Sequence, residues 1–390
     1  MKKKILFFLT SLSVGGTEKV IVTYINELSK EPDYELILCV MFQLDCVDTL
    51  ENTVSSSVKI LYLCDVQTGN QFHRRYLNYQ KSYLDKVIYG LTQWFYNITL
   101  EHQFKNIVLD NKPDILVQGD SGMPQYISKY KDLKTIIFVH FSVDHLYSRF
   151  FKKLRTKLWI NRLKGYKYVV TIAEVMFKQL KHFCSENQLV LIYNPIQKSK
   201  ILALSQENLI LPLGIEKNNY IVSIGRLDEN QKDFAGLINS IAYIRNKYSI
   251  EYKLLIVGEG RDRTTLESLV YQNKLENQIY FIGNQINPYP YIKHSNLLVL
   301  STKFEGLPTV LLEALLLNKL AISSDCFTGP AEILNHKQLL APIGEKNALA
   351  EKIHNLLQNE ELQAEMYAHL MKQKQYFNPT KSIEKMKKIF

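Results

Sequence analysis

Short apolar runs rich in valine, isoleucine, leucine and phenylalanine alternate with longer stretches of helical periodicity along this chain. Such continuous apolar runs are typical of parallel strands, because helices cover both faces of a parallel sheet. The predicted strands are residues 4–9, 34–41, 58–63, 113–119, 134–140, 167–172 and 189–193 in the first half, and 220–225, 253–258, 279–283, 297–301 and 320–324 in the second. The pattern predicts an α/β fold of two doubly wound, Rossmann-like domains with parallel sheets.

The chain length and one irregular interval indicate where the two domains divide. A chain of 390 residues is too long for one hydrophobic core and suits two domains. The interval 194–219 contains two prolines and turn residues but no clear strand, which is typical of a connection between domains. We therefore predict an N-terminal domain over residues 1–196, a linker over 197–218 and a C-terminal domain over 219–374.

The composition is that of a globular protein with an excess of basic residues. The chain has 48 Lys and Arg against 38 Asp and Glu, a net charge of +10. This charge favours anionic partners, and alone it does not choose among a lipid surface, a nucleic acid and a phosphorylated small molecule.

The cysteines and the apolar runs bear on the cellular compartment. The five cysteines are scattered and include no C-x-x-C pair, so we expect reduced thiols in a cytoplasmic protein. The start MKKKILFFLTSLSVGG lacks a cleavage site and continues into a helical pattern, so we do not expect a signal peptide. No run of about 18 apolar residues occurs, so any membrane contact is expected to be peripheral.

Glycines follow several predicted strands, at the edge where parallel sheets bind ligands. Gly15 and Gly16 follow the first strand, and Gly225, Gly258 and Gly283 follow strands of the second half. Glycine lets the backbone approach a ligand closely, although a tight turn between strand and helix would need the same residue.

Two cations and two carboxylates stand near the same predicted strand ends. Arg226 and Lys232 suit a diphosphate, and the alternative is a pair of solvated surface charges. Glu305 lies in a loop, whereas Glu313 interrupts the apolar run TVLLEALLL. A buried carboxylate must be paired or hydrogen-bonded, so Glu313 either binds a ligand hydroxyl or pairs with a cation.

The helix after Glu305 is expected to start close to this site. Pro308 suits the first helical position, which would leave the amides of Thr309 and Val310 pointing toward the strand ends, where an anion is favoured.

Several motifs carry a resemblance to a known family. They are Gly15-Gly16-Thr17-Glu18, Gly225-Arg226-Leu227 with Lys232, VGEG at 257–260, FIG at 281–283, NPY at 287–289, and E-x7-E at Glu305 and Glu313 followed by SSDCFTGPAEIL. In this order they resemble glycosyltransferase family 4, retaining enzymes of the GT-B fold, in its bacterial surface-polysaccharide type. The resemblance implies two Rossmann-like domains facing a cleft, and a C-terminal helix over 375–390 that crosses back to the first domain.

The resemblance also implies roles for matching residues. Arg226 and Lys232 would neutralise the diphosphate of a nucleotide sugar, and Glu313 would hold its ribose. Glu305, with the amides of Gly306 and Leu307, would bind the donor sugar.

Further residues complete the implied site. The backbone near Ile282 and Gly283 would contact the base, and His140 would face the donor sugar across the cleft. The donor-binding set also includes the strand-end glycines and the first residues of the helix, namely Gly15, Gly16, Gly225, Gly258, Thr309 and Val310.

The implied reaction moves a hexose or N-acetylhexosamine, from UDP most of all, to a glycan or lipid-linked acceptor in lipopolysaccharide, capsule or other surface-polysaccharide synthesis. No D-x-D sequence occurs, so we expect no metal and no cofactor. The segments 72–97 and 147–168 mix basic and aromatic residues, which indicates either peripheral contact with the inner membrane surface or ordinary packing on the sheet.

Three alternatives remain open. A nucleic-acid-binding protein has only the net charge in its favour, since no recognition motif is present. The others are a catalytically silent sugar-nucleotide-binding partner of a transferase complex and a sugar-nucleotide epimerase of similar fold.

Overall fold

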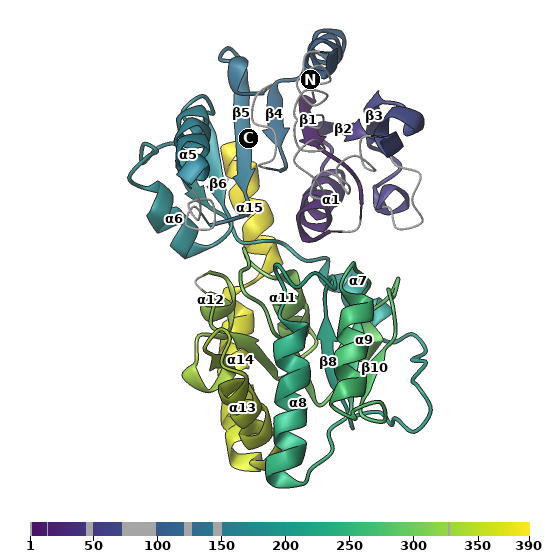
Figure 1. Cartoon of the computed structure of the whole chain (residues 1–390). Coiled ribbons are helices and arrows are strands. Elements are labelled where there is room, and N and C mark those ends of the chain that lie inside the picture. Colours follow the sequence, from purple (N-terminus) through teal and green to yellow (C-terminus); the bar gives the residue numbers. More distant parts are fainter. Residues whose placement is uncertain are drawn as a thin grey trace. The chain divides into compact units, whose positions relative to one another are not determined.

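The computed structural model describes residues 2–13, 15–43, 50–71, 99–120, 127–142, 150–326 and 328–390. The chain forms two compact units. The first contains residues 1–172, 176–195 and 380–390, and the second contains residues 173–175 and 196–379. Each unit has its own parallel sheet, so the predicted α/β fold with two parallel-sheet domains is confirmed (Figure 1).

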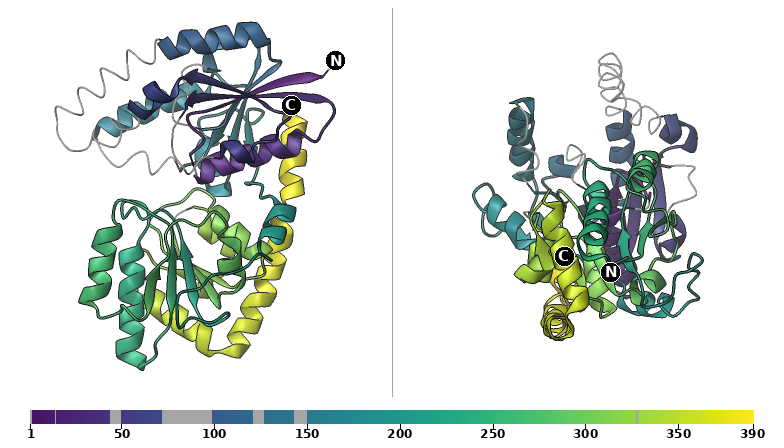
Figure 2. Two further views of the ribbon diagram at one scale, coloured as in Figure 1. Left: turned by 90° about the vertical axis from the view of Figure 1, so that its right-hand side faces the viewer. Right: turned by 60° about the horizontal axis from the view of Figure 1, so that its bottom comes forward.

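The first unit contains a seven-stranded sheet in the order β3-β2-β1-β4-β5-β6-β7. Its strands are β1 (Lys3–Leu9), β2 (Tyr34–Phe42), β3 (Lys59–Cys64), β4 (Ile115–Gln118), β5 (Lys134–Val139), β6 (Tyr168–Thr171) and β7 (Leu189–Leu191). Its named helices are α1 (Gly16–Leu28), α5 (Phe150–Leu163), α6 (Glu174–Leu180) and α15 (Pro379–Ile389), with short 3-10 turns at Glu51–Thr53 and Ile127–Lys129. Figure 2 (left) shows α1 and the helix of residues 99–111 on opposite faces of this sheet.

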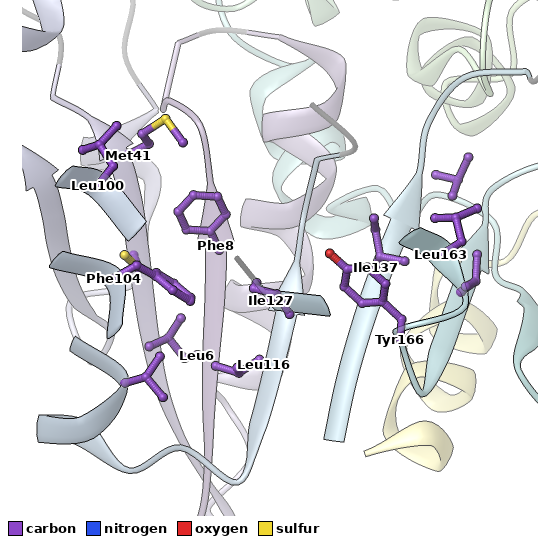
Figure 3. Close-up of a cluster of buried hydrophobic side chains, with 14 of the residues drawn as sticks. Leu6, Phe8, Met41, Leu100, Phe104, Leu116, Ile127, Ile137, Leu163 and Tyr166 are labelled. Carbon is purple, nitrogen blue, oxygen red and sulfur yellow. The ribbon is translucent and has the colours of Figure 1, made fainter. Parts of the chain in front are cut away.

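Alternate side chains of β1 pack into separate layers of the core. Leu6 and Phe8 belong to one buried cluster, in which the rings of Phe8 and Phe104 lie edge to face with centroids 5.2 Å apart (Figure 3). Phe7 points to the other face, where its ring centroid lies 6.4 Å from that of Phe390. Because both faces are covered, the strand reads as a continuous apolar run rather than as an alternating one.

The second unit contains a six-stranded parallel sheet in the order β10-β9-β8-β11-β12-β13. Its strands are β8 (Ile221–Ile224), β9 (Leu254–Val257), β10 (Ile279–Phe281), β11 (Leu297–Leu300), β12 (Ala321–Ser324) and β13 (Leu340–Ala341). Its helices are α7 (Lys198–Leu204), α8 (Phe234–Tyr248), α9 (Arg263–Gln272), α10 (Tyr289–Lys293), α11 (Thr309–Leu316), α12 (Pro330–Leu334), α13 (Lys346–Gln358) and α14 (Glu360–Tyr376), with a 3-10 turn at Lys337–Leu339.

Every predicted strand is present, and the structure adds β13. That strand has two residues, which is too short to leave a periodic pattern in the sequence. Part of the interval predicted to be a linker forms α7. The Asn287 amide donates to the Leu204 carbonyl at 2.8 Å, and the Tyr291 hydroxyl donates to the Ile210 carbonyl at 3.0 Å, which holds this interval to the second unit.

The last helix groups with the first unit. Its Lys387 ammonium donates to Glu31 at 2.6 Å, and Lys385 donates to the Leu191 carbonyl at 3.2 Å. Among the described residues, no helix combines the length and the apolar composition that a bilayer crossing needs.

Both sheets have a point where the chain order reverses, between β1 and β4 in the first unit and between β8 and β11 in the second. Ligands of doubly wound sheets bind outside the carboxyl ends of the strands at such a point. In the second unit, the topology therefore predicts a ligand site at the loops that follow β8 and β11.

Three glycines pack the strand ends of the second unit tightly together. The amide of Gly225 donates to the Val257 carbonyl at 3.0 Å, and the amide of Gly258 donates to the Gly283 carbonyl at 2.9 Å. Gly258 has φ +141°, and a Cβ atom there would overlap the Gly225 carbonyl oxygen. The close approach of backbones is therefore a structural reason for these glycines, independent of any ligand.

We expect Gly258→Ala to lower the free energy of unfolding by more than about 1 kcal/mol, because alanine at this φ is strained and overlaps a backbone atom. Urea unfolding followed by circular dichroism measures the change. Gly16→Ala is the control, since Gly16 begins a helix and has open space around it, and we expect it to be neutral or slightly stabilising. Equal midpoints for the two variants would contradict this account of Gly258.

Candidate active site

The loops that follow β8 and β11 are joined by backbone contacts. Lys232 and Thr302 form an isolated antiparallel bridge. The amide of Asp233 donates to the Ser301 carbonyl at 3.1 Å, and the amide of Lys303 donates to the Gln231 carbonyl at 2.8 Å. These contacts hold the residues that follow the two strands beside each other at the reversal point of the sheet.

Glu305 and Lys232 form a buried ion pair in this place. The exposed fractions of their side chains are 9% and 12%. The Thr302 hydroxyl donates a further hydrogen bond to the same Glu305 oxygen at 3.0 Å. The sequence predicts both residues in one site, and the structure brings them into direct contact.

The loop after β12 fixes the main chain around Glu305. The Thr328 hydroxyl donates to the Glu305 carbonyl. Gly329 has φ +50°, and a Cβ atom there would overlap the Gly306 carbonyl oxygen. Cys326 is buried in the same loop, and burial together with the charge of Glu305 raises the pKa of its thiol to about 12. No role is predicted from the sequence for Cys326, Thr328 or Gly329, although the motif SSDCFTGPAEIL contains all three.

Helix α11 begins at Thr309, and the preceding Pro308 is extended, with φ −68° and ψ 116°. Pro308 therefore lies directly before the first helical residue, which agrees with the prediction that it is near the helix start, and its ψ is far from the helical value. The first amides of any α-helix have no carbonyl partner within the helix. In α11 these include the amides of Thr309 and Val310, as predicted.

Glu313 lies in the second turn of α11 and has an exposed fraction of 7%. Tyr289, the first residue of α10, lies close enough for their charges to interact: burial, and then the Glu313 carboxylate, raises the pKa of the Tyr289 phenol. Tyr289 belongs to the NPY motif, for which the sequence alone predicts no separate role of this tyrosine.

Arg226 is exposed, whereas the loop that carries it is tightly held. The amide of Asp228 donates to the Arg226 carbonyl at 2.8 Å, and the amide of Lys232 donates to the Asp228 carbonyl at 2.9 Å. Glu229 accepts from the amide of Phe234 at the start of α8, at 2.8 Å. The backbone that carries the guanidinium is thus fixed, and the same loop contains Lys232 of the ion pair.

The backbone predicted to meet a base lies at the end of β10. The amide of Ile282 donates to the Ile256 carbonyl at 3.0 Å, and Gly283 has φ +71°. Both residues are half-buried, and Leu307, on the loop before α11, is buried.

The candidate residues of the first unit lie at the ends of β1 and β5. Gly15 precedes α1 in extended conformation, and the Glu18 carboxylate lies over it, whereas Gly16 is exposed. His140 has an exposed fraction of 4%, and its Nε2 donates to the Gly119 carbonyl at 2.7 Å. Burial lowers the pKa of His140 to about 4, against the opposing effect of this hydrogen bond. The imidazole is therefore neutral near pH 7.

In the described part of the chain, no group of three or more His, Cys, Asp or Glu side chains is placed to hold a metal ion. The basic segment 72–97 lies outside the described residues. Of the segment 147–168, the part with described side chains has Ile160 and Leu163 buried in the core and Leu158 exposed by 49%.

Comparison with known proteins identifies the class of this site. Residues 205–372 match the family of glycosyl transferases group 1. An uncharacterised glycosyltransferase of Methanocaldococcus jannaschii is 38% identical over 181 residues, which is 44% of each chain. The GalNAc-alpha-(1->4)-GalNAc-alpha-(1->3)-diNAcBac-PP-undecaprenol alpha-1,4-N-acetyl-D-galactosaminyltransferase of Campylobacter jejuni is 25% identical over 369 residues, covering 93% of this chain and 91% of that one. Other relatives are named for lipopolysaccharide synthesis.

Comparison with solved structures identifies the fold. The structure of the Anabaena protein HepE in complex with UDP and glucose superposes with a TM-score of 0.74 at 15% identity, over 99% of this chain and 98% of that one. The two parallel-sheet units are thus those of the GT-B fold. Residues 205–372 of the second unit thus match a group 1 glycosyltransferase domain, and the predicted resemblance to glycosyltransferases is confirmed.

We expect Lys232→Met to lower the free energy of unfolding by about 3–5 kcal/mol, because it leaves the buried Glu305 carboxylate without its cation. The double variant Lys232→Met with Glu305→Met removes both charges and should be more stable than Lys232→Met alone. Urea unfolding of the wild type, both single variants and the double variant gives the interaction energy. Additive effects of the two substitutions would show that the pair is not coupled.

We expect His140 to make stability depend on pH. The folded pKa lies below the usual value of 6.5, so the folded state binds fewer protons than the unfolded state between about pH 6.5 and 4. The contribution of His140 is therefore complete above about pH 6.5 and is lost as the pH falls toward 4. His140→Gln, which keeps a donor for Gly119, should lose less stability over this range than the wild type.

Melting temperatures measured from pH 7 to 4 test this expectation. His182→Gln is the control, because His182 is exposed. If the profile of His140→Gln runs parallel to that of the wild type, the buried imidazole does not titrate as described.

Proposed function

We propose that this glycosyltransferase moves a hexose or N-acetylhexosamine from a nucleotide sugar, with UDP as the nucleotide, to a glycan or lipid-linked acceptor with retention at the anomeric carbon. The observation that carries the proposal is the buried Lys232–Glu305 pair, which joins the loop of the exposed Arg226 to the loop before α11 at the reversal point of the sheet. Positive charge and helix amides at one strand end suit a diphosphate.

The donor roles follow the contacts of the second unit. Arg226 and Lys232 would bind the diphosphate, and Glu313 would accept hydrogen bonds from the ribose hydroxyls. Glu305, with the amides of Gly306 and Leu307, would hold the sugar. Because the Lys232 ammonium and the Thr302 hydroxyl already hold the Glu305 carboxylate in one orientation, an orienting role is favoured over a nucleophilic one.

Further donor contacts are proposed for the backbone. The backbone of Ile282 and Gly283 would contact the base. Gly225 and Gly258 have no side chains, so a ligand could approach the backbone at these strand ends. Gly15, Gly16 and His140 are proposed for the first unit, where a neutral His140 would donate or accept a hydrogen bond to sugar without adding charge.

The proposed chemistry is a substitution at the anomeric carbon. The acceptor hydroxyl oxygen forms a bond to C1 on the face from which the diphosphate leaves, the bond between C1 and the diphosphate oxygen breaks, and the acceptor proton passes to that leaving oxygen. The cations and the amides of Thr309 and Val310 stabilise the charge that develops on the diphosphate. We propose that these groups replace a metal ion in this role.

The nucleotide and the acceptor are supported by the named relatives. HepE binds UDP and glucose, and the Campylobacter enzyme is named for a PP-undecaprenol-linked glycan. We propose an acceptor of this class, in lipopolysaccharide, capsule or another surface polysaccharide, reached by peripheral contact with the cytoplasmic face of the membrane. Absence of binding to anionic vesicles at low salt would remove the membrane contact from the proposal.

A silent sugar-nucleotide-binding partner and an epimerase remain as alternatives. Both would bind the donor. Product analysis with acceptor would show no transfer for the first, and analysis without acceptor would show an altered nucleotide sugar for the second.

A panel of UDP-, GDP-, ADP- and CDP-sugars in a thermal-shift experiment tests the donor site. We expect UDP-sugars to raise the melting temperature, by roughly 2–4 °C for each kcal/mol of binding free energy gained by the folded state. Glu313→Ala should abolish the shift, because it removes the proposed ribose contact. Glu276→Ala, at an exposed position of the same unit, is the control and should retain it.

Two results would count against the donor assignment. If no nucleotide sugar shifts the wild type at millimolar concentration, the proposed donor site fails. If Glu313→Ala keeps the full shift, Glu313 does not hold the ribose.

A further inference from the structure

A surface pocket of about 460 Å³ lies on the first unit at the amino ends of β5 and β6. Four lysines line it, namely Lys131, Lys134, Lys164 and Lys167, together with one carboxylate, that of Asp132. The candidate residue His140 follows the carboxyl end of β5, so the six residues of this strand, about 20 Å, separate the pocket from it. The pocket is therefore distinct from the proposed donor site.

The sheet fixes the backbone of this pocket. Lys134 is the first residue of β5, and Lys167 directly precedes β6. The amide of Lys167 donates to the carbonyl and to the hydroxyl oxygen of Thr135, at 2.9 and 3.1 Å. The turn before β6 passes close to Ser128, since a Cβ atom on Gly165 would lie 2.9 Å from the Ser128 carbonyl oxygen. The lysines thus extend from a rigid frame at neighbouring strand ends.

The positive charge of the pocket is poorly neutralised. Within the described residues, none of the four lysines forms an ion pair with a carboxylate. The Lys134 ammonium donates to the main-chain oxygen of Phe390 at 2.6 Å, and Lys3 donates to the same oxygen at 3.0 Å. Burial, and then the charges of Lys3 and Lys167, lowers the pKa of Lys134. An anion in the pocket would relieve this crowding of like charges.

We propose that this pocket binds a phosphate group, carried either by a soluble phosphate compound or by an anionic lipid headgroup. Lysine ammonium groups bind phosphate as point charges, and several around one site can share its oxygens. The volume of about 460 Å³ exceeds that of a single phosphate and leaves room for the group to which it is attached. The carboxylate of Asp132 in the lining lowers the net attraction for an anion, and four lysines outweigh it.

The test compares two triple variants of the full chain. Lys131→Gln, Lys164→Gln and Lys167→Gln together remove three exposed charges from the pocket and leave Lys134 in contact with Phe390. The matched control removes the same charge at exposed positions outside the pocket, by Lys105→Gln, Lys200→Gln and Lys217→Gln. The donor site is intact in both, so a difference between them reports the pocket. If the pocket variant melts early, the single variants Lys131→Gln and Lys164→Gln take its place.

Two probes distinguish the sources of the phosphate. Inorganic diphosphate is titrated by calorimetry in the presence of saturating UDP, which occupies the proposed donor site. Vesicles of phosphatidylcholine with and without phosphatidylglycerol are co-sedimented with the protein. A weakening of diphosphate binding by about tenfold or more in the pocket variant, with the control unchanged, supports a soluble phosphate ligand. Loss of binding to the anionic vesicles in the pocket variant only, with diphosphate affinity unchanged, supports a lipid headgroup.

The proposal is overturned if both triple variants behave alike with both probes. This outcome is separable from failure of the proposed function, because sugar transfer to a soluble acceptor depends on the donor site and should be equal in the two variants. Loss of transfer in both variants and in the wild type would count against the proposed function and not against the pocket.

Discussion

The order reversal between β8 and β11 is the constraint on which the second unit depends. Because these neighbours are not consecutive in the chain, the loops that follow them meet at one edge of the sheet, where the Lys232–Thr302 bridge joins them. This junction places the Lys232 ammonium on the Glu305 carboxylate and buries both. A buried pair of this kind is held by geometry rather than by a large net stabilisation, since desolvation offsets much of the attraction.

Contacts with the surrounding loops fix the position of the Glu305 main chain. Thr328 binds the main chain of Glu305, and Gly329 allows the loop after β12 to approach Gly306 closely. On the other side, Gly258 permits the strand ends of β8, β9 and β10 to pack without side chains between them. The site is therefore positioned by backbone contacts from neighbouring strand ends, while Arg226 keeps an exposed side chain. A rigid frame with an accessible cation is well suited to bind a charged ligand without reorganising.

The basic residues have different surroundings in the two units. In the second unit, Lys232 pairs with the buried Glu305 at the carboxyl ends of the strands. In the first unit, four lysines gather at the amino ends of β5 and β6 with a single carboxylate in the lining. Because parallel strands direct their two ends to opposite edges of a sheet, the lysine pocket lies at the edge opposite to the one that His140 follows.

The sequence by itself determined the elements and the chemical types of the site. Apolar runs such as 4–9 and 221–224 are read directly as strands, since local pattern decides whether a segment can be buried on both faces. The motif from Glu305 to Glu313 likewise indicated an anion-binding helix start. Only the tertiary structure decided that Lys232 pairs with Glu305 and that lysines 131 to 167 share one pocket. These contacts join residues far apart in the chain, and their distances depend on strand order, which no local pattern encodes.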